Sequence, residues 1–249
     1  MTSVIYIMWL RQLKRTWRSK SRMFGSLAQP ILFLVALGFG FGPIFQKAGG
    51  GNYVDFLAPG IIAMSILFTS MFAGIEVLWD KEFGFLKETL VAPVSRYKIM
   101  IGRTLGGATV ASIQGVIVFF LAFLLGFRPS SILMIPLAFL FMFMIALLFT
   151  ALGTAIASKI DDMQAFPIIL NFIIMPLFFL SGALFPLNNL PEALSIVTRL
   201  NPLSYGVDAV REALTGAGHF NLFTDFAVLG TIMVVVMFIG SYFFEKIQI

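Results

Sequence analysis

The sequence lacks several residues on which chemistry usually depends. It contains no cysteine and one histidine, His219, so disulfides, thiolate metal sites and a histidine-based metal cluster within one chain are excluded. It has no GxxxxGK loop, so it does not bind ATP through a P-loop. His219 lies in a loop rich in small residues, and the pair Asp161-Asp162 has no third acidic partner nearby. We expect both sites to be solvated turns rather than metal ligands.

Charge is also scarce. Only 12% of the 249 residues are charged, 59% are hydrophobic, and the mean hydropathy is +0.96. Soluble domains carry about 25% charged residues, so this composition is typical of a polytopic membrane protein. The length leaves no room for a second large soluble domain, so residues 1–249 are expected to form a single transmembrane domain. The net charge of +5 is attributed to cytoplasmic loops and anionic headgroups, not to nucleic acid.

Six segments have the length and composition of membrane spans. A spanning helix needs about 20 mostly apolar residues. The segments that qualify are 25–45, 57–78, 101–126, 132–157, 166–184 and 224–244. The sequence therefore predicts an all-α integral membrane protein with six transmembrane helices.

The distribution of positive charge predicts the orientation. Of the 17 Lys and Arg residues, all but four fall on one side of the predicted membrane. The four on the opposite side are Lys47, Arg128, Arg199 and Arg211. Because basic residues gather on the cytoplasmic side, both termini are predicted to lie in the cytoplasm.

The first 24 residues have the pattern of an amphipathic helix. At 100° per residue, one face carries Ile5, Trp9, Leu13 and Trp17, and the opposite face carries Arg11, Lys14, Arg15, Arg18 and Arg22. Such a helix is expected to lie in the plane of the headgroups. Two interpretations stay open, a membrane-surface anchor and a lever that a cytoplasmic partner pushes.

The connection between the second and third spans predicts a short amphipathic cytoplasmic helix at 81–91. Apolar residues at helical spacing form one stripe (Phe83, Leu86 and Leu90), and the other side is polar (Asp80, Glu82, Lys87 and Glu88). Pro93 ends the helix because proline cannot continue the hydrogen-bond ladder. The helix either rests on the membrane or docks into a soluble partner.

The region 185–223, before the last span, is unusual because it is apolar and contains two helix starts. Asn188 to Pro191 and Asn201-Pro202 each place a capping residue at or just before a proline. Two short helices between spans predict a re-entrant region, which the charge distribution places outside. Within it, Asp208 and Arg211 stand at i, i+3 and are expected to pair on one helix face. Two roles stay open for them, a part in the gate and the mere holding of that helix in place.

Small and aromatic residues give weaker signals. Gly102-xxx-Gly106-Gly107 and Gly153-xxx-Ala157 predict close helix approach. Phe and Met residues of spans two and five are candidates for the lining of a hydrophobic cavity. The alternative is that they face lipid or pack in the core. Glu76 is the exceptional carboxylate near the end of span two, and it is either interfacial or at the inner mouth of a pathway.

Two segments resemble the permease subunits of type-2 ABC exporters. Residues 83–96, FGFLKETLVAPVSR, are similar to the coupling helix of that family. Leu180-Ser181-Gly182, Phe185-Pro186, Leu190-Pro191 and Asn201-Pro202-Leu203-Ser204-Tyr205, through Asp208 and Arg211, are similar to its signature before the last span. The amphipathic first helix and the six spans fit the same layout.

The resemblance implies a half-transporter in the plasma membrane of a bacterial or archaeal cell. Two copies would form a homodimer among membrane lipids, and two separate ATP-binding cassette subunits would hold ATP and Mg²⁺. No cofactor is expected in this chain, and it would not itself be an enzyme. The implied substrate is a hydrophobic or amphipathic molecule such as a drug or lipid. A lipid-linked polysaccharide exporter and an ATP-independent carrier or channel are the alternatives.

The resemblance also assigns roles to residues. The residues implied to contact the ATPase are Asp80, Glu82, Phe83, Leu86, Lys87, Glu88, Arg96, Arg15 and Arg18. Those implied to line the substrate path are Phe68, Met71, Phe72, Glu76, Asn171, Met175, Phe178 and Phe179. Those implied to form an outer gate are Leu180, Phe185, Pro186, Pro191, Asn201, Pro202, Tyr205, Asp208 and Arg211.

Overall fold

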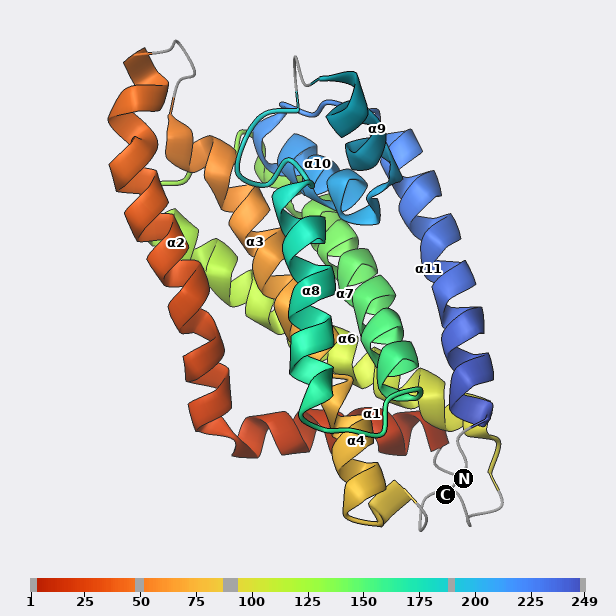
Figure 1. The fold of residues 1–249 in the computed structure, drawn as a ribbon. Helices are drawn as coiled ribbons and strands as arrows, with labels where there is room; N and C mark the ends of the chain where they lie inside the picture. Colours follow the sequence, from red (N-terminus) through yellow and green to blue (C-terminus); the bar gives the residue numbers. More distant parts are fainter. Residues whose placement is uncertain (1–3, 48–51, 87–93, 188–190, 247–249) are drawn as a thin grey trace.

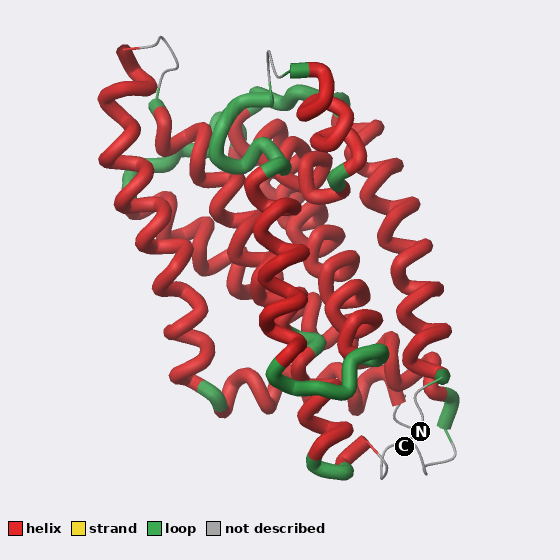
Figure 2. Tube along the Cα trace, viewed as in Figure 1, coloured by secondary structure: helices red, strands yellow, loops and turns green. Residues whose placement is uncertain are grey.

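All secondary structure that the computed structural model describes is helical, which confirms the all-α prediction (Figure 2). The described residues are 4–47, 52–86, 94–187 and 191–246. The elements are α1 Val4–Arg18, α2 Lys20–Lys47, α3 Tyr53–Phe72, α4 Ile75–Glu82, α6 Arg96–Leu124, η1 Ile132–Met134, α7 Ile135–Ala157, α8 Ala165–Phe179, α9 Glu192–Leu200, α10 Pro202–Thr215 and α11 Leu222–Glu245.

The helices form a bundle with a different cap at each end (Figure 1). α2, α3, α6, α7, α8 and α11 run between the two ends, and α3 is buried among the others. α1 lies across one end, where α4 and the last turn of α11 also lie. α9 and α10 lie at the opposite end. The first and the last described helices therefore both reach the same end of the bundle (Figure 1).

Within the described part of the chain, five helical segments are long and apolar enough to cross a membrane: Met23–Phe45, Tyr53–Glu82, Arg96–Leu124, Ile132–Ala157 and Leu222–Glu245. The predicted span 166–184 corresponds to α8, which is apolar but has only 15 residues. Its predicted outer end is wrong, because the chain turns after Phe179. Gly182 takes a left-handed conformation (φ 75°) that ends the helical path, and the Ser181 hydroxyl donates to the Phe178 carbonyl.

Glycines allow two close helix approaches that the sequence predicts. A Cβ added at Gly153 of α7 would overlap the backbone carbonyl of Met71 on α3. At Gly102 of α6, an added Cβ would lie 2.6 Å from Met8 Cβ on α1. The small-residue motifs therefore place α7 against α3 and α1 against α6, where side chains would hold the backbones apart.

The predicted amphipathic helix at the start of the chain is confirmed as α1, but much of it packs against protein. Gln12 is buried, and the Trp9 indole N–H donates to the Thr109 hydroxyl of α6 over 3.0 Å. Trp17, by contrast, is 75% exposed. The helix therefore divides its apolar face between a docked first part and an open last part.

The predicted helix 81–91 is interrupted near its start. Residues 85 and 86 are helical again, and residues 87–91 lie outside the described part of the chain. α4 ends at Glu82, and Gly84 takes a left-handed conformation (φ 76°) that ends its helical ladder. The turn places Phe83 68% exposed and Leu86 fully buried, so these two residues do not share one apolar stripe. Leu90, with Lys87 and Glu88, lies outside the described residues. A second break, at Ala73-Gly74, separates α4 from α3 within the predicted second span.

Candidate transport site

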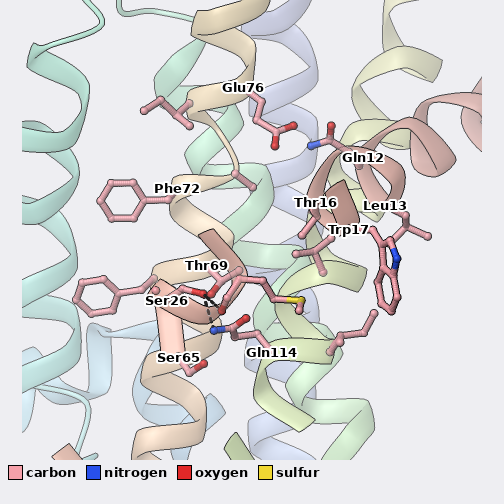
Figure 3. Close-up of a pocket in the computed structure, with 18 of the residues that line it drawn as sticks. Gln12, Leu13, Thr16, Trp17, Ser26, Ser65, Thr69, Phe72, Glu76 and Gln114 are labelled. Carbon is pink, nitrogen blue, oxygen red and sulfur yellow. Dashed lines mark hydrogen bonds between the residues drawn. The ribbon is translucent and has the colours of Figure 1, made fainter. Parts of the chain in front are cut away.

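A cavity of about 930 Å³ opens between α1, α2, α3, α4 and α6 (Figure 3). It lies beside the end of the bundle that α1 covers. α3 supplies one wall with Ser65, Phe68, Thr69 and Phe72, and the opposite wall comes from α1 and α6. Its volume falls within the range of about 300–1,000 Å³ that small-molecule sites occupy.

The lining of the cavity is amphipathic. The apolar part contains Trp17, Met23, Met64, Phe68, Phe72, Ile113 and Ile117. The hydrogen-bonding part contains Gln12, Ser26, Gln29, Ser65, Thr69, Glu76 and Gln114. The Gln114 amide donates to the Ser26 hydroxyl over 2.8 Å, whereas the buried Ser65 hydroxyl has no hydrogen-bond partner within the described ranges. A buried hydroxyl without a partner is costly unless something else satisfies it, so this wall is suited to a ligand or to water.

The structure divides the predicted substrate-path residues into three groups. Phe68, Phe72 and Glu76 line the cavity. Met71 and Phe178 are buried in the bundle, at 0% and 2% exposure. The third group, Asn171, Met175 and Phe179, lies on the exposed face of α8. Only part of the predicted path therefore converges on one space within a single chain.

Sequence reasoning missed most of the polar lining. Gln12, Ser26, Ser65 and Gln114 were not among the predicted site residues, although each supplies the cavity with a hydrogen-bonding group. The signal that was present is the polar residue inside an apolar span, which Ser65 and Gln114 both provide. The contribution of α1 to the cavity lining has no such signal in the sequence, because it depends on how α1 packs against the other helices.

A buried charge cluster lies behind the cavity. Asp80 of α4 accepts hydrogen bonds from Arg103 of α6 and from Arg11 of α1, the latter over 3.0 Å. Arg15 lies 3.4 Å from Asp80 and 3.7 Å from Glu76. The side chains of Asp80 and Arg103 are 3% and 5% exposed. The prediction that Asp80 lies on an outward polar face is therefore wrong, because it joins three helices from inside.

A second ion pair at the same end is exposed. Lys81 of α4 pairs with Asp161, which lies in the turn between α7 and α8 and whose side chain is 85% exposed. The hydrogen bond and charge of Lys81 lower the pKa of Asp161. Asp161 thus lies in a solvated turn, as predicted. The neighbouring position Glu82 is exposed, as is Arg18 at the end of α1, and Arg96 donates to the carbonyl of Glu245.

At the opposite end of the bundle, Asn201 joins α9 to α10. Its side-chain oxygen accepts from the Leu203 N–H, and its amide donates to the Leu177 carbonyl of α8 over 2.7 Å. Pro202 occupies the first turn of α10, so the predicted helix start at Asn201-Pro202 is confirmed. Of the earlier predicted start, Pro191 directly precedes α9, whereas residues 188–190 lie outside the described part.

The predicted pairing of Asp208 with Arg211 is wrong. Arg211 donates to the Gly182 carbonyl over 2.8 Å and lies over the ring of Phe56. Asp208 instead accepts from the backbone N–H groups of His219 and Phe220. The two side chains leave α10 toward different neighbours, and each fixes the helix to another part of the fold.

The other residues of the predicted outer gate lie around these contacts. The Tyr205 hydroxyl donates to the Arg199 carbonyl over 2.8 Å, and its ring stacks on Phe220. Leu180 follows the last residue of α8, and Phe185 and Pro186 are exposed in the segment that leads toward α9.

Comparisons with known proteins agree with this architecture. A family model described as "ABC-2 type transporter" matches residues 3–215. The chain is 29% identical over 219 residues to Nodulation protein J of Rhizobium leguminosarum bv. viciae, which covers 87% of this chain and 83% of that protein. It is 30% identical over 195 residues to Nodulation protein J of Rhizobium meliloti, covering 78% and 74% of the two chains.

The relatives also include a protein with another name. "Putative transport permease ycf38" of Cyanophora paradoxa is 29% identical over 196 residues, which span 76% of this chain and 66% of that protein, just under two thirds of its length. The family match extends from the start of α1 through α10, and so includes the cavity, the charge cluster and the helix start at Asn201. This multi-pass membrane protein belongs to the ABC-2 type transporter family.

Proposed function

We propose that the chain is the membrane subunit of an ATP-driven exporter that moves an amphipathic molecule out of the cytoplasm or the inner leaflet. Separate ATP-binding cassette subunits would hold ATP and Mg²⁺ and supply the energy. The observation that carries this proposal is the cavity, whose apolar wall and row of hydrogen-bonding groups lie beside α1 and α4. Such a lining favours a molecule that has both an apolar part and a polar head.

The two parts of the lining would play different roles in binding. Burying apolar surface of the substrate against Phe68, Phe72 and Ile117 is favourable by about 25 cal/mol per Å². Gln114 and Ser65 would orient the polar head, because a buried polar group must find a partner. Drugs and lipids fit this description. The sugar of a lipid-linked glycan would engage the same groups, and it is our second candidate.

Coupling to the ATPase is proposed to act through α1 and α4. Phe83 and Phe85 are large apolar side chains exposed just beyond α4. α4 itself lies at the end of the bundle that α1 covers (Figure 1). Because Asp80 binds Arg11 and Arg103, a push on α4 would move α1 and α6 with it. Such a rigid-body shift would change the width of the cavity between them.

A second copy of the chain is proposed to pack against α8. The exposed face of α8 carries Ile168, Phe172 and Met175 together with Asn171, whose amide makes no hydrogen bond within the described residues. In hydrocarbon an amide without a partner is costly, so a lipid-facing position is poorly suited to Asn171. A homodimer that covers this face would satisfy Asn171 and bring Met175 and Phe179 to a shared path.

We expect Gln114→Leu to weaken the response to amphiphiles about 5-fold. The substitution removes a cavity hydrogen bond worth about 1 kcal/mol and leaves Ser26 without its donor. The complex with the ATPase subunit would be purified in nanodiscs. ATP hydrolysis would then be measured against a series of lysophospholipids and alkyl glycosides, which separates lipid from glycan preference.

Gln164→Leu is the matched control, because Gln164 is exposed in the turn before α8. The half-maximal amphiphile concentration should rise for Gln114→Leu and stay unchanged for Gln164→Leu. Equal responses of both variants would contradict the cavity as binding site. Transport without ATP by the chain alone would instead favour a carrier or channel.

A further inference from the structure

Three carboxylates meet at the end of the bundle that α9 and α10 cover. Asp208 and Glu212 stand one turn apart on α10, and Asp225 belongs to the first turn of α11. One oxygen of each lies within 4.8 Å of the other two. Two ligands of one calcium ion, each 2.3–2.6 Å from it, are at most about 5 Å apart, so these oxygens have the spacing of a shared coordination sphere.

Asp225 provides the second observation. It is 0% exposed, and neither of its carboxylate oxygens has a hydrogen-bond partner among the residues that the structure describes. The Oε2 atom of Glu212 is also buried without a partner. Removing a carboxylate from water without compensation is among the most costly arrangements in a protein. Neighbouring carboxylates that are buried in this way require a bound cation or bound protons to neutralise their charge.

No Lys or Arg among the described residues forms an ion pair with the cluster, although the charge of Arg211 interacts at longer range with that of Asp208. Arg211 is the nearest candidate along α10, but its guanidinium points to the Gly182 carbonyl and the ring of Phe56. Asp208 accepts backbone N–H groups from His219 and Phe220. These bonds orient its carboxylate and occupy both lone pairs of Oδ2, which leaves a lone pair on Oδ1 for a further ligand. Gly218 lies close against Glu212, where a Cβ would be 2.9 Å from the Glu212 Cβ, so this loop covers the cluster.

We propose that Asp208, Glu212 and Asp225 bind a divalent cation, with calcium as the ion. Three carboxylates offer only hard oxygen ligands, which calcium prefers, and their spacing suits its radius better than the tighter octahedron of magnesium. Water and backbone carbonyls would complete the shell. On the orientation predicted from the basic residues, the site faces the outside of the cell.

The cation would fasten α10 to α11. α10 carries Arg211, which holds the turn after α8 through the Gly182 carbonyl. Asp208 holds the loop 216–221 through His219 and Phe220. Binding at the three carboxylates therefore ties α8, α10 and α11 together at one end of the bundle. This proposal does not depend on the substrate or on the ATPase.

The test is thermal unfolding of the purified full chain in detergent, in EDTA and in rising CaCl₂ or MgCl₂. We expect calcium to raise the midpoint of the wild type by several degrees, and magnesium to act more weakly. Asp225→Asn should unfold at or above the wild-type midpoint in EDTA, because carboxylate repulsion is relieved, and below it in calcium. A structural role alone does not produce this crossing. Asp55→Asn is the control, since Asp55 also lies in a first helical turn, at α3.

Several results would overturn the proposal. These are no shift of the wild type with calcium, a shift with magnesium alone, or an equal calcium shift in Asp225→Asn. A lower midpoint of Asp225→Asn in both solutions would also overturn it. Stabilisation by acid without any by calcium would identify shared protons instead. If Asp225→Asn does not fold, Glu212→Gln replaces it, because Glu212 is only partly buried, and the same crossing is expected.

Discussion

Asp80→Asn is expected to lower the free energy of unfolding by about 3–5 kcal/mol, because it leaves a buried guanidinium without its counter-charge. Arg103 is 4% exposed and depends on Asp80 for its ion pair. Asparagine has nearly the same shape, so the loss reports charge and not volume. The measurement is chemical or thermal unfolding of the purified chain in detergent.

A double variant separates a charge effect from a packing effect. Asp80→Asn with Arg103→Met removes both buried charges, and replacing a whole buried pair by apolar residues is often neutral. We expect this variant to recover much of the lost stability. Asp161→Asn is the control. Asp161 also forms an ion pair, with Lys81, but its side chain is exposed, and exposed ion pairs contribute little to stability. Equal effects of Asp80→Asn and Asp161→Asn would contradict a buried cluster.

The functional consequence of Asp80→Asn should exceed its effect on folding. Arg11 and Arg15 of α1 both reach Asp80, so the variant releases α1 from α4. If the cluster transmits motion, ATP hydrolysis by the complex should lose its response to amphiphiles at temperatures where the protein stays folded. A folded variant with full stimulation would show that the cluster is structural only.

Gly102→Leu is expected to detach α1 from α6. An added Cβ at this position lies 2.6 Å from Met8 Cβ and 2.8 Å from the Ile5 carbonyl oxygen, and the latter belongs to the backbone and cannot rotate away. Overpacking of this kind costs about 1–3 kcal/mol, which corresponds to a rise of about 5- to 150-fold in the undocked population of α1. Trypsin cleavage after the basic residues of α1 measures that population directly.

Gly40→Leu is the matched control for this experiment. Gly40 also lies in a helix near other glycines, but an added Cβ there meets nothing within 4 Å. We expect its cleavage rate to equal that of the wild type. If trypsin cleaves Gly102→Leu no faster than Gly40→Leu, α1 is held by other contacts. The proposal that Gly102 allows α1 to dock on α6 would then be contradicted.

The sequence alone predicted the elements whose signals are local. The apolar segments, the amphipathic first helix and the capped start at Asn201-Pro202 each depend on residues that are neighbours in the chain. The glycines at 102 and 153 were also recognisable, because small residues at helical spacing allow close packing. Which helix each glycine contacts was not predictable, since the partner lies far away in sequence.

Three of the predictions made from the sequence are wrong for physical reasons that the structure shows. Asp80 and Arg103 are separated in the sequence, and Asp80 looks like an exposed carboxylate until three helices enclose it. Gly84 was included in a predicted helix because the apolar residues around it have helical spacing. Its left-handed conformation interrupts that helix. Asp208 and Arg211 have the spacing of a pair, but Gly182 and the loop at His219 offer each a better partner. Tertiary contacts explain the first and the third error, whereas the break at Gly84 lies in the local backbone, with nothing within 4 Å of an added Cβ.

The central claim is that this chain, with an ATPase, moves amphiphiles through the cavity between α1, α3 and α6. The most direct test is a flop assay in proteoliposomes that contain the purified complex. A lysophospholipid with a fluorescent headgroup would be placed in the leaflet on the ATPase side, and its transfer followed by quenching in the opposite leaflet. We predict transfer that requires ATP and that falls with Gln114→Leu. Transfer that proceeds equally without ATP, or that ignores Gln114→Leu, would contradict the account.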